Sequence, residues 1–270
     1  LSKNHKMHLS PKNRISFPTF SKYIFVLFWG LSFIHQELRA QDAGEIQVYG
    51  SATIPKFTSI IELHSNYTFK GPKLKEWYHP LLETIEITSG LSDNFELGFY
   101  IFTYDYEGKL QYTGSHIRPR VKAPDHWNWP IGVSLSTEIG FDKDPITNEN
   151  EWGTEIRPIF DKTLGNHYWS FNPTLGVSFT NNEVAFEPNF KYAYASSQKA
   201  SIGLEYYGNT GKLLSPYKLP NQQHQLYAVI DLFLHPLYEF NLGIGKGLTE
   251  SSNGLNVKCY IGRRINWKHK

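Results

Sequence analysis

A period-two alternation of apolar and polar residues runs through most of this chain, and it limits the folds that the chain can adopt. In residues 135–141, Leu135, Thr137, Ile139 and Phe141 would share one side of an extended strand, and small or polar residues fall between them. Successive side chains of a β-strand point to opposite faces. The alternation therefore predicts an all-β protein in which each strand has one apolar face and one polar face.

The alternating segments number twelve and lie near 57–69, 81–91, 95–106, 110–121, 130–141, 152–162, 167–179, 184–195, 200–209, 223–234, 238–248 and 255–266. Membrane barrels of this type have an even number of tilted strands, each of about 9–11 residues or more. We therefore predict a single antiparallel up-and-down transmembrane β-barrel of about 12 strands. A soluble β-sandwich also alternates, with its apolar faces in a core, and is the alternative fold.

The first 40 residues have the features of a secretory signal peptide. Five basic residues and no acidic residue precede the apolar run 23–34 (YIFVLFWGLSFI). That run is shorter than the roughly 20 residues of a transmembrane helix, and Ala40 offers a small residue before cleavage. We expect residues 1–40 to direct export in a Gram-negative bacterium, with a start at Met7 also compatible; a buried core helix is the alternative interpretation.

The remaining chain divides into an N-terminal segment, 41–56, and the barrel, 57–267. Gly50 and Pro55 make the segment a poor membrane strand, so we expect it to form a periplasmic lid or plug. Residues 1–40 contain six basic residues and one acidic residue. Without them, 27 − 6 = 21 basic and 25 − 1 = 24 acidic residues remain, so the formal charge changes from +2 to −3. A charge of this sign and size does not indicate nucleic-acid binding.

The connections between the predicted strands alternate in length, except that 107–109 is short on the outer side and 124–129 is longer on the inner side. Those at 92–94, 163–166, 196–199 and 235–236 are short, whereas 70–80, 142–151, 210–222 and 249–254 are longer and polar. If both chain ends are periplasmic, the longer set lies outside the cell. Aromatic residues near strand ends are expected to form girdles at the two membrane interfaces; they are Trp77, Tyr78, Tyr104, Tyr106, Trp127, Trp129, Tyr168, Trp169, Tyr206, Tyr207, Tyr238 and Trp267.

Charged and histidine side chains fall on the faces opposite to the apolar ones. A basic side chain facing lipid at mid-depth costs roughly 2–4 kcal/mol, so we predict that these side chains line the lumen. The lumen-lining candidates are Glu62, His64, Glu86, Glu96, His116, Arg118, Arg120, Glu138, Glu155, Arg157, Glu187, Lys191, Glu205, Asp231, Lys258 and Arg264.

Unpaired charges inside the barrel would be unfavourable, so we expect carboxylate–guanidinium pairs between neighbouring strands. Glu138 with Arg118 or Arg120 is one expected pair, and Glu155 with a neighbour of Arg157 is another. Two interpretations of the charged face are open. It is either a packed polar core or a polar pathway in which the three arginines recognise an anion, and a barrel of this size is compatible with both.

Catalytic and metal-binding patterns are weak. Ser65 follows His64 and Ser115 precedes His116, but adjacent strand residues point to opposite faces and cannot form a dyad. The single Cys259 excludes an internal disulfide framework and a cysteine-based zinc cluster, and the eleven histidines are scattered. No helix pattern follows the glycines of 243–247, which are expected to relieve crowding on the inner wall. We predict no catalytic residue, no metal site and no cofactor.

Several short motifs resemble those of a known family. They are 62–67 (ELHSNY), 90–98 (GLSDNFELG), 117–120 (IRPR), 155–159 (EIRPI), 204–208 (LEYYG) and 243–249 (GIGKGLT). With these motifs the chain resembles the uncharacterised bacterial outer-membrane proteins grouped with the MetA-pathway phenol-degradation barrels, which are similar to hydrocarbon-uptake channels. The resemblance implies uptake of small molecules, including apolar or aromatic ones, and assigns no binding residue.

We therefore expect an outer-membrane, porin-like barrel that is a passive channel or binding pore for small solutes and not an enzyme. Its expected partners are outer-membrane lipid, the barrel-insertion machinery and an unidentified small solute, with no nucleic acid. The alternative is a structural or interaction barrel with a sealed polar lumen, whose extracellular loops bind partners.

Overall fold

The computed structural model describes residues 45–144 and 147–267. The predicted signal peptide and the first residues of the predicted N-terminal segment lie outside this part of the chain. Within it, no helix is long and apolar enough to cross a membrane. The short 3-10 helices η1 (Asp125–Trp127) and η2 (Leu219–Asn221) lie in connections between strands.

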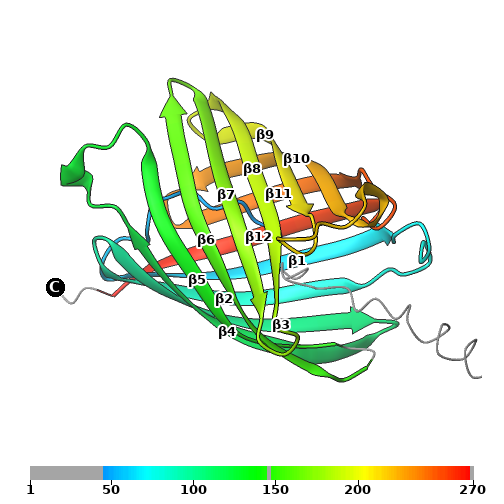
Figure 1. Ribbon diagram of the computed structural model, residues 1–270. Coiled ribbons are helices and arrows are strands. Elements are labelled where there is room, and N and C mark those ends of the chain that lie inside the picture. Colours follow the sequence, from blue (N-terminus) through cyan, green and yellow to red (C-terminus); the bar gives the residue numbers. More distant parts are fainter. Residues whose placement is uncertain (1–44, 145–146, 268–270) are drawn as a thin grey trace, which may run out of the picture. The chain divides into compact units, whose positions relative to one another are not determined.

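The described residues form twelve antiparallel strands that close into one barrel (Figure 1). Each strand pairs with its neighbours in the chain, and β1 closes the ring against β12. The strands are β1 (Thr58–Lys70), β2 (Leu81–Ser92), β3 (Phe95–Tyr106), β4 (Lys109–Lys122), β5 (Gly132–Lys143), β6 (Asn150–Leu164), β7 (His167–Ser178), β8 (Glu183–Ser197), β9 (Ala200–Asn209), β10 (Gln223–His235), β11 (Tyr238–Gly247) and β12 (Leu255–Asn266). The predicted up-and-down barrel is confirmed, and every strand end lies within two residues of the predicted one.

Burial alternates along the strands as the sequence pattern predicts. On β5, Ser136 and Glu138 are buried, whereas Leu135 and Ile139 are 43% and 50% exposed. A soluble sandwich would cover these apolar side chains in a core. Here they stand on the outside of a single closed wall, so the sandwich alternative is excluded and the exterior is suited to contact with acyl chains.

Ring closure satisfies the backbone of the first and last strands. β1 and β12 pair in register, with Glu62 opposite Gly262 and His64 opposite Tyr260. A closed ring leaves no sheet edge with unpaired N–H and C=O groups. This is the condition that hydrocarbon surroundings impose on a spanning sheet.

The predicted aromatic girdles are correct only in part. Trp77 and Trp127 are 64% and 52% exposed, as a girdle requires, but Tyr104 and Tyr207 are buried. Those two predictions were wrong because both tyrosines share strand parity with the inward glutamates Glu96 and Glu205, so their side chains point to the inner face.

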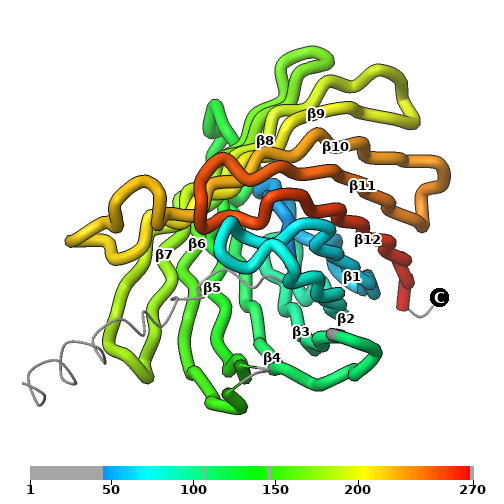
Figure 2. The backbone as a smooth tube through the Cα atoms, turned by 90° about the vertical axis from the view of Figure 1, so that its right-hand side faces the viewer, coloured from blue at the N-terminus to red at the C-terminus, as the bar shows by residue number. Residues whose placement is uncertain are grey.

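The chain before β1 lies inside the barrel. In Figure 2 this blue stretch is seen within the ring of strands. Val48 is buried in an apolar cluster with Tyr207, Tyr227 and Val229 of the wall. The segment ends at Phe57, whose φ of 65° turns the chain into β1. We call residues 45–57 the inner segment.

Candidate functional site

Arg118 on β4 is the centre of a buried ion-pair network on the inner face. Its guanidinium donates hydrogen bonds to Glu86 Oε1 at 2.6 Å, to Glu96 Oε1 at 3.1 Å and to the Thr88 hydroxyl at 3.0 Å. Arg120, two residues along the same strand, contacts the same Glu96 oxygen at 2.7 Å. The network therefore links three neighbouring strands through charge-assisted hydrogen bonds.

Tyr49 of the inner segment is surrounded by three arginines. The guanidinium carbons of Arg118 and Arg157 each lie 4.8 Å from the centre of its ring, and that of Arg120 lies 5.4 Å away. The Tyr49 hydroxyl is 3.0 Å from the Tyr100 hydroxyl. Cation–π contacts of this kind strengthen when they are desolvated. The three arginines considered for anion recognition thus face an aromatic ring of the protein itself.

Wall side chains also hold the backbone of the inner segment. The Tyr49 N–H donates to Asn172 Oδ1 at 2.9 Å, and Asn172 Nδ2 donates back to the Tyr49 carbonyl at 3.0 Å. Arg120 donates to the carbonyl oxygens of Gly50 at 3.1 Å and Ala52 at 2.9 Å. The segment has no sheet partner at these residues, so side chains satisfy its backbone groups.

Two carboxylates complete this anchoring. Asp161 accepts hydrogen bonds from the Ser51 N–H at 2.9 Å and from the Ser51 hydroxyl at 2.7 Å. Glu96 accepts from the Ile54 N–H at 2.6 Å. Glu96 thus contacts Arg118 and Arg120 of the wall and also the backbone of the inner segment, so it connects the ion-pair network to that segment.

A second charged cluster lies on β8, β9, β10 and β12. Lys191 is 3.0 Å from both Glu205 and Asp231. Lys258 also forms an ion pair with Glu205, and its ammonium donates to the Ile46 carbonyl at 2.8 Å. Two cations and two carboxylates balance, so the cluster is neutral in sum.

Further candidates form local pairs. His116 Nδ1 lies 2.9 Å from Glu138, and its Nε2 lies 3.1 Å from Asp142. Arg157 pairs with Glu155, two residues before it on β6. Both pairs face the interior. The His116–Glu138 pair joins β4 to β5, whereas Glu155 and Arg157 lie on the same strand.

Three more candidates complete the set: Glu187 and Arg264 lie apart from these clusters, whereas Glu62 is the register partner of Glu86 and lies beside the Arg118 network. Glu187 is fully buried and accepts from Asn209 at 2.9 Å. Glu62 is buried beside Gly262 of β12. Arg264 pairs with Glu239 and is 30% exposed.

The structure thus buries fourteen of the sixteen predicted lumen residues, and His116 and Arg264 are half-buried. Their role toward a solute stays a prediction. The expected pairing partners were wrong, because Glu138 contacts His116 and Glu155 contacts Arg157 itself.

A glycine explains the unexpected partners of Arg118. Gly98 on β3 lies opposite Arg118, and a Cβ at Gly98 would be 3.3 Å from the arginine Nε. Without that side chain, Arg118 extends across β3 and reaches Glu86 on β2, away from Glu138 on β5. Strand adjacency alone does not reveal such a reach.

Sequence reasoning did not identify the functional side chains of the inner segment. Glu45 is 4% exposed, and this burial raises the pKa of its carboxyl well above its ordinary value. Glu45 lies in a group with His64 and Glu86 whose potential ligand atoms are all within 4.8 Å of one another. Glu45 and Tyr49 precede the first alternating segment, so the strand periodicity that identified the other candidates contained no signal for them.

The two adjacent Ser and His pairs do not form hydroxyl–imidazole contacts, as the strand parity predicted. The Ser115 hydroxyl is 2.8 Å from the Tyr112 hydroxyl, whereas His116 faces Glu138 and Asp142. His64 is buried, and Ser65 points to the other face. The parity argument from the sequence is confirmed for both pairs.

Searches with the sequence find no matching protein-family model and no matching curated protein. Solved structures do match. The COG4313 outer membrane channel from Pseudomonas putida F1 has a TM-score of 0.58 and 10% identity, and the match covers 82% of this chain and 100% of that chain. The KdgM porin has a TM-score of 0.53 and 8% identity over 76% and 98% of the two chains, and the NanC porin has 0.52 and 9% over 77% and 100%. At these identities, the likeness shows a shared barrel fold.

Proposed function

We propose that this protein is an outer-membrane channel for small solutes and that its inner segment is a plug in the lumen. The observation that carries the proposal is the inner segment itself. The ring of strands encloses a stretch of chain that belongs to no strand and is held by side chains. A lumen wide enough for such a stretch has room for a solute when the stretch moves or leaves a gap beside it.

The apolar exterior of the barrel supports a location in the outer membrane. The apolar side chains of the wall are solvent-exposed in the isolated barrel, and a lipid bilayer is the environment that covers them. The predicted signal peptide would supply the export, and the similar barrels include an outer membrane channel and two porins. These points together support insertion in the outer membrane of a Gram-negative bacterium.

The solute class is proposed from the inner aromatic side chains. Tyr100, Phe102 and Tyr104 of β3 and Tyr207 and Tyr227 of β9 and β10 are all buried on the inner face. Two of these rings pack against Val48 of the inner segment, and the Tyr100 hydroxyl contacts that of Tyr49, so displacement of the segment would expose aromatic rings to a passing molecule. This favours small neutral solutes with an aromatic or apolar part, as the resemblance to the phenol-degradation barrels implies, and a conduit without catalytic steps.

Conductance and liposome swelling test the proposal. We expect the protein without residues 1–40 to raise single-channel conductance in planar bilayers above the lipid baseline. In proteoliposomes we expect a neutral aryl glucoside to enter faster than a neutral sugar of similar size. Tyr49→Ala should raise the conductance at least twofold because it removes the ring packed between three arginines.

Tyr238→Ala is the matched control, since this tyrosine is exposed at a strand end. It should leave the conductance unchanged. Electrophoretic mobility would show whether each protein is folded. If the folded wild type and the folded Tyr49→Ala variant both give no flux, the channel function is contradicted and a sealed structural barrel is favoured.

A further inference from the structure

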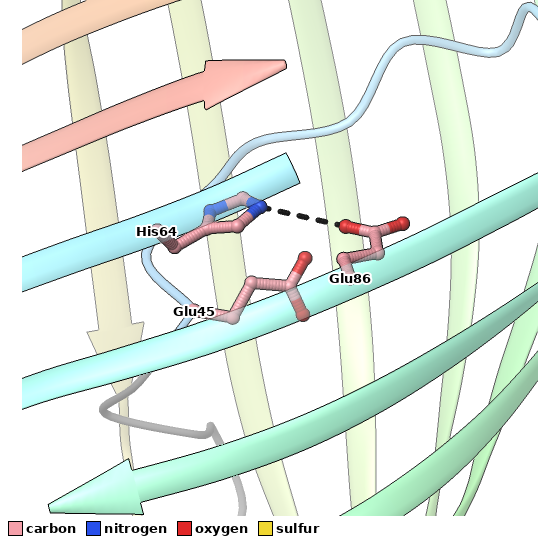
Figure 3. A group of neighbouring side chains, drawn as sticks. All are labelled: Glu45, His64 and Glu86. Carbon is pink, nitrogen blue, oxygen red and sulfur yellow. Dashed lines mark ion pairs between the residues drawn. The ribbon is translucent and has the colours of Figure 1, made fainter. Parts of the chain in front are cut away.

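Three buried side chains from different parts of the chain converge inside the barrel. Glu45 comes from the inner segment, His64 from β1 and Glu86 from β2 (Figure 3). Their exposures are 4%, 2% and 1%. His64 Nε2 lies 3.5 Å from Glu86 Oε2, and the Glu45 carboxylate faces the same space.

The atoms that face one another lack hydrogen-bond partners. Apart from the 3.5 Å contact between His64 and Glu86, the atoms Glu45 Oε1, His64 Nε2 and Glu86 Oε2 are fully buried and form no hydrogen bond. A buried polar atom without a partner is unfavourable, and three at one point are unexpected in a native interior. A ligand that accepts electron pairs from all three would satisfy them together.

The surroundings fix two of these side chains. The second oxygen of Glu86 accepts from Arg118 at 2.6 Å and from Thr88 at 2.5 Å. The His64 ring lies 5.2 Å from the ring of Tyr260. Glu86 and His64 are therefore held in place by the wall, and Glu86 Oε2 and His64 Nε2 face each other beside Glu45.

We propose that Glu45, His64 and Glu86 bind a divalent transition-metal ion, with Zn²⁺ as the best fit. One imidazole nitrogen and two carboxylate oxygens, completed by water, form a tetrahedral set that suits zinc. Bonds of about 2.0–2.2 Å in that geometry place ligand atoms roughly 3.3–3.6 Å apart, which matches the 3.5 Å between His64 and Glu86. Ca²⁺ and Mg²⁺ are less suitable because they prefer more ligands, all of them oxygen.

The charges around the group agree with a bound cation. Glu62 lies two residues before His64 and opposite Glu86 on the same inner face. Arg118 is the basic group in contact with Glu86, and it is shared with Glu96. Three carboxyl groups, those of Glu45, Glu62 and Glu86, therefore lie beside the single guanidinium that touches the group.

Because Glu45 belongs to the inner segment, a bound metal would attach that segment to the barrel wall. Two ligands belong to the wall and one belongs to the inner segment, so an occupied site joins the segment to β1 and β2. The metal would then hold the plug in place, and metal removal would release it at this point. This consequence for flux rests on the proposed channel function, whereas metal binding itself does not.

Metal binding by the folded barrel in detergent micelles tests the site without any assay of flux. We expect Zn²⁺ to bind one to one by titration calorimetry, and Co²⁺ to give the visible absorption of a tetrahedral ion. Glu45→Gln and His64→Gln should each weaken Zn²⁺ affinity at least tenfold. Glu45 lies outside the strands, so its variant tests the site even if the His64 variant folds poorly.

Two control variants separate this site from adventitious binding. Glu187→Gln removes an equally buried carboxylate with an unpartnered oxygen elsewhere in the wall, and His126→Gln removes an exposed histidine. Neither should change the affinity. Absence of stoichiometric Zn²⁺ binding, or binding that is unchanged in Glu45→Gln, would overturn the metal site.

Flux then distinguishes the two proposals. If Zn²⁺ binds to the three residues and lowers the conductance of the wild type but not of Glu45→Gln, both the metal site and the channel function are supported. If Zn²⁺ binds to the three residues but neither the wild type nor any variant conducts, the metal site is supported and the channel function is contradicted.

Discussion

At the scale of single residues, the inner wall depends on glycines that make room for large neighbours. Gly245 on β11 pairs with Tyr227 on β10, and a Cβ at Gly245 would lie 2.3 Å from the tyrosine ring. The ring cannot easily move, because its hydroxyl donates to Gln225 at 2.7 Å and lies 3.1 Å from Asn256 Nδ2. The expectation that the glycines of 243–247 relieve crowding is confirmed at this position.

Gly245→Ala should therefore destabilise the barrel. Overpacking of this kind costs about 1–3 kcal/mol, which urea unfolding followed by tryptophan fluorescence would measure. In a Tyr227→Ala background the clash is absent, so the same glycine substitution should cost much less. Equal costs in the two backgrounds would show that the glycine acts through backbone conformation and not through space for Tyr227.

At the scale of elements, the proposed plug requires that the inner segment change position while the wall stays closed. Its residues from Tyr49 to Ile54 are held mainly by side chains of the wall, such as Asn172 and Asp161, and not by a sheet ladder. Hydrogen bonds of this sort contribute about 0.5–1.5 kcal/mol each, and somewhat more when one partner is charged. Such contacts can be exchanged without breaking the barrel.

A disulfide between the segment and the wall tests this mobility. Ser51→Cys with Asp161→Cys, in a Cys259→Ser background, joins two side chains that are 2.7 Å apart in the wild type. We expect the oxidised protein to conduct several-fold less than the same protein after reduction, because the tether prevents displacement of the segment.

The wall itself offers a control for this cross-link. Ser59 and Ser89 are register partners on β1 and β2, and their hydroxyls are 2.7 Å apart. Cysteines at these positions should cross-link two strands without a redox effect on conductance. Identical conductance of the segment variant before and after reduction would mean that the segment is a static part of the wall lining.

At the scale of the whole molecule, the fold separates an apolar exterior from an ionic interior. Leu204 in the middle of β9 is 48% exposed, and it lies in an apolar groove of about 780 Å³ formed by β8 to β12. Leu214 in the long connection after β9 is 96% exposed. Only the first of these leucines belongs to the apolar exterior of the strand wall.

Arginine substitutions at these two positions test the orientation of the barrel in lipid. Leu204→Arg should reduce the free energy of folding into vesicles by roughly 2–4 kcal/mol, as measured by urea titration in the presence of lipid. Leu214→Arg should change it by less than about 0.5 kcal/mol, since the connection lies in water. Similar values at both positions would contradict a membrane-spanning β9.

Much of this molecule follows from the sequence alone. The strands, their number and the face of each residue were predictable, because a period of two is a local property that each segment carries by itself. The burial of Glu96, Arg118 and Glu205 followed from the same parity. The misplacement of Tyr104 and Tyr207 in the girdles came from reading position along the strand without applying that parity.

The tertiary structure decided the ionic partners and the place of the inner segment. Arg118 reaches Glu86 because the intervening strand carries Gly98, and this depends on the register of three strands at once. Glu45 meets His64 and Glu86 only because the chain before β1 lies within the closed ring. Period and charge specify which way a side chain points, whereas the contact between distant residues depends on how the whole wall closes around them.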